Sequence, residues 1–182
     1  MVMNIAVYCS ARTNIAPECF NDARELGEWI GSNGHTLVYG GLEMGLMDAV
    51  ASATRLAGGK VVGVVPWNRK ERQHPANTTN LYVTTLHERK QMMEEQADAF
   101  VALDGGYGTL DEVMSALASM SFFDEPKPLF LLNRDGLYDP LEQMLREMVT
   151  RGLMFPEVLP RVSFCPTLPH LLNSLSDMSV NV

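Results

Sequence analysis

Short apolar runs alternate along the chain with longer amphipathic stretches, and turn residues separate the two kinds of segment. The runs are apolar throughout instead of alternating with polar residues, which predicts strands buried on both faces of a sheet. We predict strands at residues 4–9, 36–39, 60–65, 81–84, 99–103, 128–132 and 162–164.

The stretches between these runs predict helices, because their apolar residues recur at helical spacing. The first helix begins near Pro17, which suits a first turn, and ends at Asn33 and Gly34. Further helices are predicted at residues 45–57, 87–97, 109–123, 138–151 and 168–175, with a break at 124–126. Residues 67–80 form the one long polar stretch without a clear period.

Strands that alternate with helices predict an α/β fold, a mostly parallel sheet with helices on both faces. The 182 residues fit a single domain spanning 1–182. Ligands of such sheets bind beyond the carboxyl ends of the strands, at a switch point in the strand order. The turns at 10–14, 40–45 and 105–109 are predicted to meet there.

The composition of the chain limits the classes of function that it can have. Apolar residues make up 46% and charged residues 20% of the chain, which is typical of a globular protein. A formal charge of −8 argues against non-specific nucleic-acid binding, although it permits a small anionic ligand. Three widely spaced cysteines indicate a reduced, cytoplasmic setting with no metal site. We expect no secretory signal and no membrane segment, because no basic n-region or run of about 18 apolar residues occurs.

The candidate chemistry lies between His87 and Glu112. A buried strand is followed by the glycine-rich turn 105–108, and then by Thr109, a predicted helix N-cap. Glu112 stands at the capping-box spacing from Thr109. The N-terminus of a helix binds anions through free N–H groups and its dipole, and glycine lets a phosphate approach closely.

Each feature also has a purely structural interpretation. The turn 105–109 could be a tight connection without a ligand, and Glu112 could serve only as a cap. Arg89 and Lys90 begin a helix, where cations oppose the dipole, so they indicate a nearby anion or else a solvated charge pair. The turn 40–45 lacks the G-x-G-x-x-G order and a clear acidic ribose partner, which disfavours an NAD site.

The segments 86–93, 97–100 and 105–112 together resemble the Lonely Guy (LOG) family. Its members are cytokinin riboside 5′-monophosphate phosphoribohydrolases that were long mislabelled lysine decarboxylases. The family pairs Arg-Lys with a Pro-Gly-Gly-x-Gly-Thr-x-x-Glu turn. The likeness extends to residues 7–10, 38–41 with 45–47, 62–66, and 127–128 with 131–133.

The resemblance implies a Rossmann-like homodimer without a cofactor, which hydrolyses nucleoside 5′-monophosphates, AMP or cytokinin riboside monophosphates, to free base and ribose 5-phosphate. It implies that Arg89 and Glu112 are catalytic. The positions expected to bind substrate are Lys90, Gly105, Gly106, Tyr107, Gly108, Thr109 and Glu71, together with Ser10, Gly40 and Gly41 from the other two turns.

The chain departs from the family pattern at several positions. Asp104 replaces the proline before the glycines, Leu42 stands where a third glycine is frequent, and Leu86 replaces a common methionine. Ala118 and Ser119 replace a frequent Thr-Trp pair. These changes bear on base preference and activity more than on the fold.

In the mechanism that these residues suggest, Glu112 stabilises an oxocarbenium-like cation at C1′ and orients or deprotonates water. Arg89 binds the phosphate or ribose hydroxyls and keeps Glu112 ionised. The alternative is a non-catalytic nucleotide carrier or sensor, which Asp104 favours by adding negative charge near the phosphate. A pyridoxal-phosphate decarboxylase would need a Schiff-base lysine and a pyridine-nitrogen partner, and the sequence singles out neither.

Overall fold

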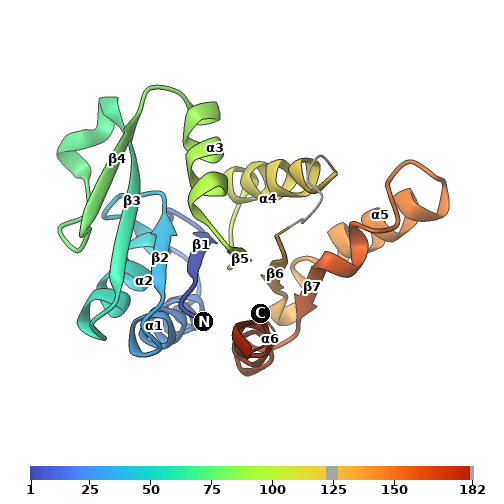
Figure 1. Ribbon diagram of the computed structural model, residues 1–182, viewed down its shortest axis with the longest axis horizontal. Coiled ribbons are helices and arrows are strands. Elements are labelled where there is room, and N and C mark those ends of the chain that lie inside the picture. The colour runs from blue at the N-terminus through green and yellow to red at the C-terminus, as the bar shows by residue number, and fades with distance from the viewer. Residues whose placement is uncertain (122–126, 181–182) are drawn as a thin grey trace.

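Seven parallel strands form the central sheet of the computed structural model, which describes residues 1–121 and 127–180 (Figure 1). Their order across the sheet is β4-β3-β2-β1-β5-β6-β7. The strands are β1 (Asn4–Tyr8), β2 (Thr36–Tyr39), β3 (Lys60–Pro66), β4 (Thr79–Val83), β5 (Ala99–Ala102), β6 (Leu129–Leu132) and β7 (Val162–Cys165).

The strand order reverses at β1, which pairs with β2 on one side and with β5 on the other. Val7 of β1 lies opposite both Tyr39 and Val101. The loops that follow these three strands therefore emerge together, which is the position where open α/β sheets bind ligands.

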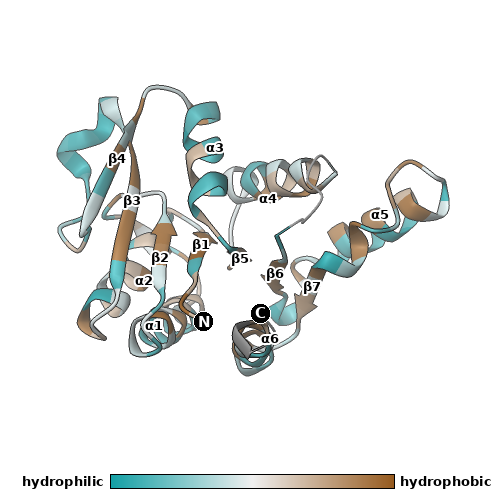
Figure 2. Cartoon of the chain, in the orientation of Figure 1, coloured by the Kyte–Doolittle hydropathy of each residue, from teal (hydrophilic) through white to brown (hydrophobic). Residues whose placement is uncertain are grey.

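Three helices cover each face of the sheet over the described residues (Figure 1). One face carries α1 (Pro17–Ser32), α2 (Gly45–Leu56) and α6 (Leu168–Val180). The other carries α3 (Leu86–Gln96), α4 (Tyr107–Met120) and α5 (Asp139–Thr150). Short 3-10 turns are η1 (Trp67–Arg72), η2 (Arg134–Gly136) and η3 (Leu159–Arg161). Figure 2 shows hydrophobic central strands and a largely hydrophilic α3.

Glycines allow α1 to lie close to α2. A Cβ added at Gly27 would overlap the carbonyl oxygen of Val50, and one at Gly31 would lie 2.5 Å from the carbonyl oxygen of Thr54. The backbones approach each other because no side chain separates them. This packing holds the C-terminal half of α2 against α1.

The structure confirms the predicted α/β fold, and the sheet is parallel throughout the described residues. Element ends differ from prediction in two places that matter for the site. α4 begins at Tyr107 instead of Thr109, and β4 begins at Thr79 instead of Leu81. The predicted break at 124–126 lies outside the described residues. No helix within the described ranges is long and apolar enough to span a membrane.

Candidate active site

A pocket of about 270 Å³ lies beyond the carboxyl ends of β1, β2 and β5. The loop after β1, the end of β2, and the N-terminal turns of α2, α3 and α4 surround it. The lining residues are Val7, Cys9, Ser10, Ala11, Arg12, Gly40, Met47, Leu86, Arg89, Lys90, Gly106, Tyr107, Gly108, Thr109, Asp111 and Glu112.

Arg89 and Glu112 meet at the base of this pocket. Arg89 Nη1 lies 3.8 Å from Glu112 Oε1, and each side chain is 15% exposed. Arg89 Nε donates to the carbonyl oxygen of Val64 (3.1 Å), and Nη2 donates to that of Gly40 (2.7 Å). Backbone carbonyl groups near the ends of β2 and β3 therefore fix the guanidinium in place, with one nitrogen turned to the carboxylate.

Glu112 titrates near neutral pH. Burial raises the pKa of Glu112 to about 7, and the positive charge of Arg89 lowers it by a smaller amount. Arg89 thus acts in the predicted direction, but desolvation outweighs it. The expectation that Arg89 keeps Glu112 ionised needs correction, because a substantial fraction of the carboxyl is protonated at pH 7. A buried acid with this pKa is suited to proton transfer.

The start of α4 differs from the predicted capping box. Gly106 is the N-cap and provides no side-chain hydrogen bond. Thr109 lies inside the first turn, is 3% exposed, and packs against Gly105, where an added Cβ would overlap its side chain. Glu112 consequently belongs to the second turn. The first N–H groups of a helix have no partner within it, so this uncapped start offers free donors beside the pocket.

The predicted kind of cap is found instead on α3. Thr85 accepts a hydrogen bond from the backbone N–H of Glu88 (3.1 Å), and the Glu88 carboxylate accepts one from the N–H of Thr85 (3.3 Å). The carboxylate also accepts from the N–H of Thr84 (2.7 Å). This capping box holds the helix turn that carries Arg89 and Lys90.

Lys90 reaches from α3 toward α4 at the mouth of the pocket. Its Nζ lies 2.7 Å from Asp111 Oδ1, and the two side chains are 21% and 57% exposed. The ammonium group therefore already has an anionic partner. The predicted substrate contact of Lys90 would have to share or replace this ion pair.

Three predicted binding residues, Gly41, Gly105 and Glu71, do not line the pocket. Gly41 has a φ of 75°, and a Cβ there would lie 2.6 Å from a methyl of Val65. Its role is therefore a tight turn. Gly105 accommodates the Thr109 side chain. Glu71 is exposed on η1, away from the lining residues.

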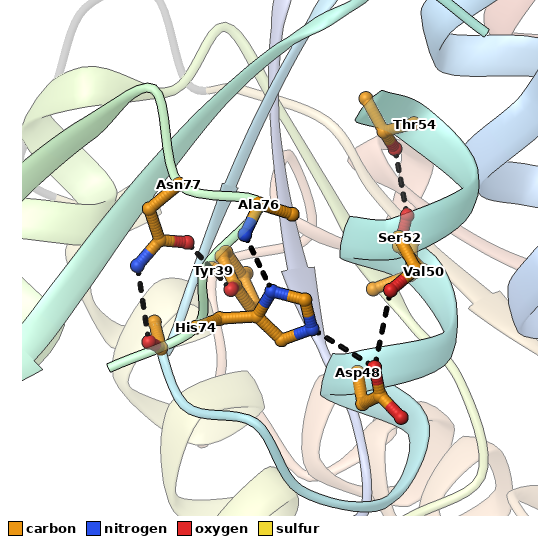
Figure 3. A network of polar contacts seen from close by, with 9 residues as sticks. Tyr39, Asp48, Val50, Ser52, Thr54, His74, Ala76 and Asn77 are labelled. Carbon is orange, nitrogen blue, oxygen red and sulfur yellow. Dashed lines mark hydrogen bonds and ion pairs between the residues drawn. The ribbon is translucent and has the colours of Figure 1, made fainter. Parts of the chain in front are cut away.

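A polar network holds the segment after η1 against the sheet (Figure 3). The buried His74 ring accepts at Nδ1 from the N–H of Ala76 (2.9 Å), so Nε2 carries the proton and faces Asp48 Oδ1 at 2.9 Å. Tyr39 donates its hydroxyl hydrogen to Asn77 Oδ1 (2.6 Å). These bonds place the segment outside the pocket, and their role is structural.

Arg12, Cys9, Met47, Leu86 and Asp111 line the pocket but were not among the predicted site residues. The turn 10–14 was placed at the correct sheet edge, and Arg12 is its one cation. That charge is the signal that could have identified it. Within the described ranges, no group of three His, Cys, Asp or Glu side chains is arranged to hold a metal ion.

Known proteins are similar in sequence to this chain over most of its length. The profile of a family described as "Possible lysine decarboxylase" matches residues 47–175. A cytokinin riboside 5′-monophosphate phosphoribohydrolase of Mycobacterium tuberculosis is 40% identical over 162 residues, 87% of this chain and 85% of the relative. A probable enzyme of the same name from Oryza sativa subsp. japonica is 36% identical over 175 residues, 95% of this chain and 77% of the relative.

The chain belongs to the LOG family. Among solved structures, the molybdenum cofactor carrier protein of Chlamydomonas reinhardtii superposes with a TM-score of 0.78 and 22% identity over the whole of both chains. The molybdenum cofactor binding protein of Rippkaea orientalis gives 0.77 and 22%, covering 98% of each chain. At this identity the likeness establishes the fold alone.

The most consequential departure from the LOG pattern is Asp104, which follows β5. Its backbone carbonyl accepts from the N–H of Ser10 (3.0 Å), but its Oδ2 is buried without a hydrogen-bond partner within the described part of the chain. Burial raises the pKa of Asp104, and nearby Asp22 raises it further, whereas its own backbone N–H, the Cys19 thiol and Arg134 lower it by less. The carboxylate is therefore poorly stabilised, and it adds no lining surface to the pocket.

Asp104→Asn is expected to stabilise the protein at pH 8 by about 1 kcal/mol, or roughly 2–4 °C in Tm. The folded-state pKa is raised above the unfolded value of about 4. The wild type therefore loses stability as pH rises between those two values, and the neutral amide does not. Thermal melts at pH 3, below the unfolded pKa, and at pH 8 should show the variant's advantage only at the higher pH.

Asp135→Asn is the matched control, because it removes the same charge from an exposed position nearby whose φ of 56° asparagine also tolerates. It should leave Tm almost unchanged at both pH values. Equal shifts in the two variants would mean that net charge, and not the buried carboxylate, sets the effect.

Proposed function

We propose that this protein hydrolyses the N-glycosidic bond of nucleoside 5′-monophosphates, including cytokinin riboside 5′-monophosphates and AMP, to the free base and ribose 5-phosphate. The observation that carries the proposal is the buried pair formed by Arg89 and Glu112 at the floor of a switch-point pocket. Relatives that are 36–40% identical, matched over 77–85% of their own length, bear the name of this activity.

Breaking this bond builds positive charge at C1′ of the ribose. Ionised Glu112 can stabilise that charge and take a proton from the attacking water. Because its pKa is about 7, it can then release the proton at neutral pH. Arg89, fixed by Gly40 and Val64, limits the rise of that pKa, so it positions and tunes the carboxylate.

The N-terminus of α4 would hold the 5′-phosphate. Gly106, Tyr107 and Gly108 line the pocket, and the N–H groups at this uncapped helix start are available to an anion. Glu112 stands one turn further along the same helix, so a phosphate bound here would leave the ribose near the carboxylate. Remote binding of this kind lowers the barrier by fixing the reacting groups in position.

The test is to incubate the purified protein with AMP and with isopentenyladenosine monophosphate. Chromatography measures the free base, and a reducing-sugar assay measures ribose 5-phosphate. We expect the two products in equal amounts. The alternative is a nucleotide carrier. Nucleotide binding in calorimetry without release of base from either substrate would favour the carrier and contradict hydrolysis.

We further propose that two copies associate through α4. Leu86, Tyr107, Leu110 and Met114 are 68%, 89%, 39% and 39% exposed, and the last three lie on α4. Large apolar side chains gathered on one helix are typical of an interface.

Met114→Lys should then shift the sedimentation coefficient from that of a dimer to that of a monomer. Leu56→Lys, at an 89% exposed position ending α2, is the control that should leave it unchanged.

The expected cytoplasmic location remains part of this proposal. Cys9, Cys19 and Cys165 are all free thiols, which fits a reducing compartment. Burial raises the pKa of the Cys9 thiol, so this residue contributes a neutral surface to the pocket floor.

A further inference from the structure

Three of the described residues that line the pocket carry positive charge, namely Arg12, Arg89 and Lys90. Two of them already have partners. Arg89 donates to two backbone carbonyl groups and lies beside Glu112, and Lys90 pairs with Asp111. Over residues 1–121 and 127–180, the guanidinium of Arg12 makes no hydrogen bond or ion pair. Its five N–H donors are available to a ligand.

The loop that carries Arg12 is held beside the start of α4. The N–H of Ser10 donates to the carbonyl oxygen of Asp104 (3.0 Å), which joins this loop to the turn that leads into α4. The carbonyl oxygen of Ser10 accepts from the N–H of Leu46 (2.9 Å), and its hydroxyl accepts from the N–H of Arg12 (3.0 Å). The backbone of Arg12 is therefore anchored, while its exposed side chain extends from an ordered base.

The charges that line the pocket favour Arg12 as the cation that meets an anionic ligand. Glu112 and Asp111 both line the pocket, and the whole chain has a formal charge of −8. These two carboxylates already face Arg89 and Lys90, so the charge of Arg12 is available to a phosphate dianion, beside a helix N-terminus equivalent to about half a charge. A free guanidinium can bind two phosphate oxygens at once through its planar fork.

We propose that Arg12 binds the 5′-phosphate and is the residue that makes the site prefer nucleotides to nucleosides. The inference rests on the proposed function, because it assigns one part of that substrate to one residue. It also moves the phosphate contact away from Arg89, whose donors are held by Gly40 and Val64.

The experiment measures binding separately from turnover. AMP and adenosine are titrated calorimetrically into the Glu112→Gln protein, which is expected not to consume the substrate, and into the same protein carrying Arg12→Gln. We expect the Kd for AMP to rise by about 10- to 100-fold, as for the loss of charge-assisted hydrogen bonds, and the Kd for adenosine to change less than about twofold. Arg12→Lys should give an intermediate Kd for AMP, because it keeps the charge but loses the fork.

Arg55→Gln is the matched control, because Arg55 is exposed in the last turn of α2 and does not line the pocket. It should leave both Kd values unchanged. An unchanged Kd for AMP in Arg12→Gln, or equal weakening for AMP and adenosine, would overturn the inference. If AMP binding depends on Arg12 but the wild type releases no base, the inference stands and the proposed hydrolysis fails.

Discussion

Glu112→Gln should lower kcat for release of adenine from AMP by about 10²- to 10⁴-fold, the usual range for removing a catalytic acid or base. Glutamine has nearly the same shape, so the packing of α4 around Val113 and Ala116 should persist. It can neither take a proton from water nor offset positive charge at C1′. The loss should therefore appear in kcat, whereas binding of AMP, which depends on the phosphate end, should change little.

The pH dependence of kcat/KM provides a second test of the role of Glu112. Burial raises the pKa of Glu112 to about 7, so below this pH the carboxyl is protonated and cannot act as a base. In the wild type kcat/KM should fall tenfold for each pH unit below about 7, because one proton is taken up. The residual activity of Glu112→Gln should lack this step at about pH 7 and keep only the step at about pH 6 that comes from titration of the substrate phosphate.

Glu147→Gln is the control for this experiment, because Glu147 lies on α5, is 54% exposed on its side chain, and is paired with Arg151. Its kcat should equal that of the wild type. Base release that is undiminished in Glu112→Gln, with the pH step still present, would remove Glu112 from the chemistry and would sink the proposed mechanism.

The sequence was sufficient to predict the parts of this molecule that follow from a regular pattern. Uninterrupted apolar runs identified β1, β2 and β5, and their alternation with helices implied that their carboxyl ends would meet. Arg89 and Glu112 were named from the family pattern. Their proximity depends on contacts far apart in sequence, such as Arg89 with the carbonyl group of Gly40, which no local pattern records.

The misplaced residues share a physical cause. Thr109 has the preferred N-cap chemistry, but a glycine-rich turn can begin a helix without any side-chain cap, so α4 starts two residues earlier. Glu71 lies within the aperiodic segment 67–80, and the carbonyl oxygen of Gly41 accepts from the N–H of His74 in that segment. The path of the segment is set by His74 and Asn77 bonding to Asp48 and Tyr39. Such long-range polar contacts leave no periodic trace in a single sequence.

Gly40→Ala should lower kcat by about 10²-fold or more, although position 40 supplies no functional group. An added Cβ would overlap Arg89 Nη2 and lie 3.0 Å from its Cζ. The guanidinium must then leave the carbonyl oxygen of Gly40, which it now reaches at 2.7 Å, and move relative to Glu112. Without this cation near it, the carboxyl has a still higher pKa, so the pH step in kcat/KM should move above 7.

A double-mutant cycle separates this effect from general damage to the fold. If Gly40→Ala acts only by displacing Arg89, then Arg89→Ala should reproduce both the loss of kcat and the raised pH step. The combined variant should be no worse than Arg89→Ala alone, because the overlap no longer exists. Additive losses of kcat, or a Gly40→Ala protein with the wild-type pH profile, would contradict this account. Either result would show that the hydrogen bond between Arg89 and Gly40 does not control the pKa of Glu112. The outcome therefore decides whether the Arg89 cation acts on the substrate or on the acid beside it.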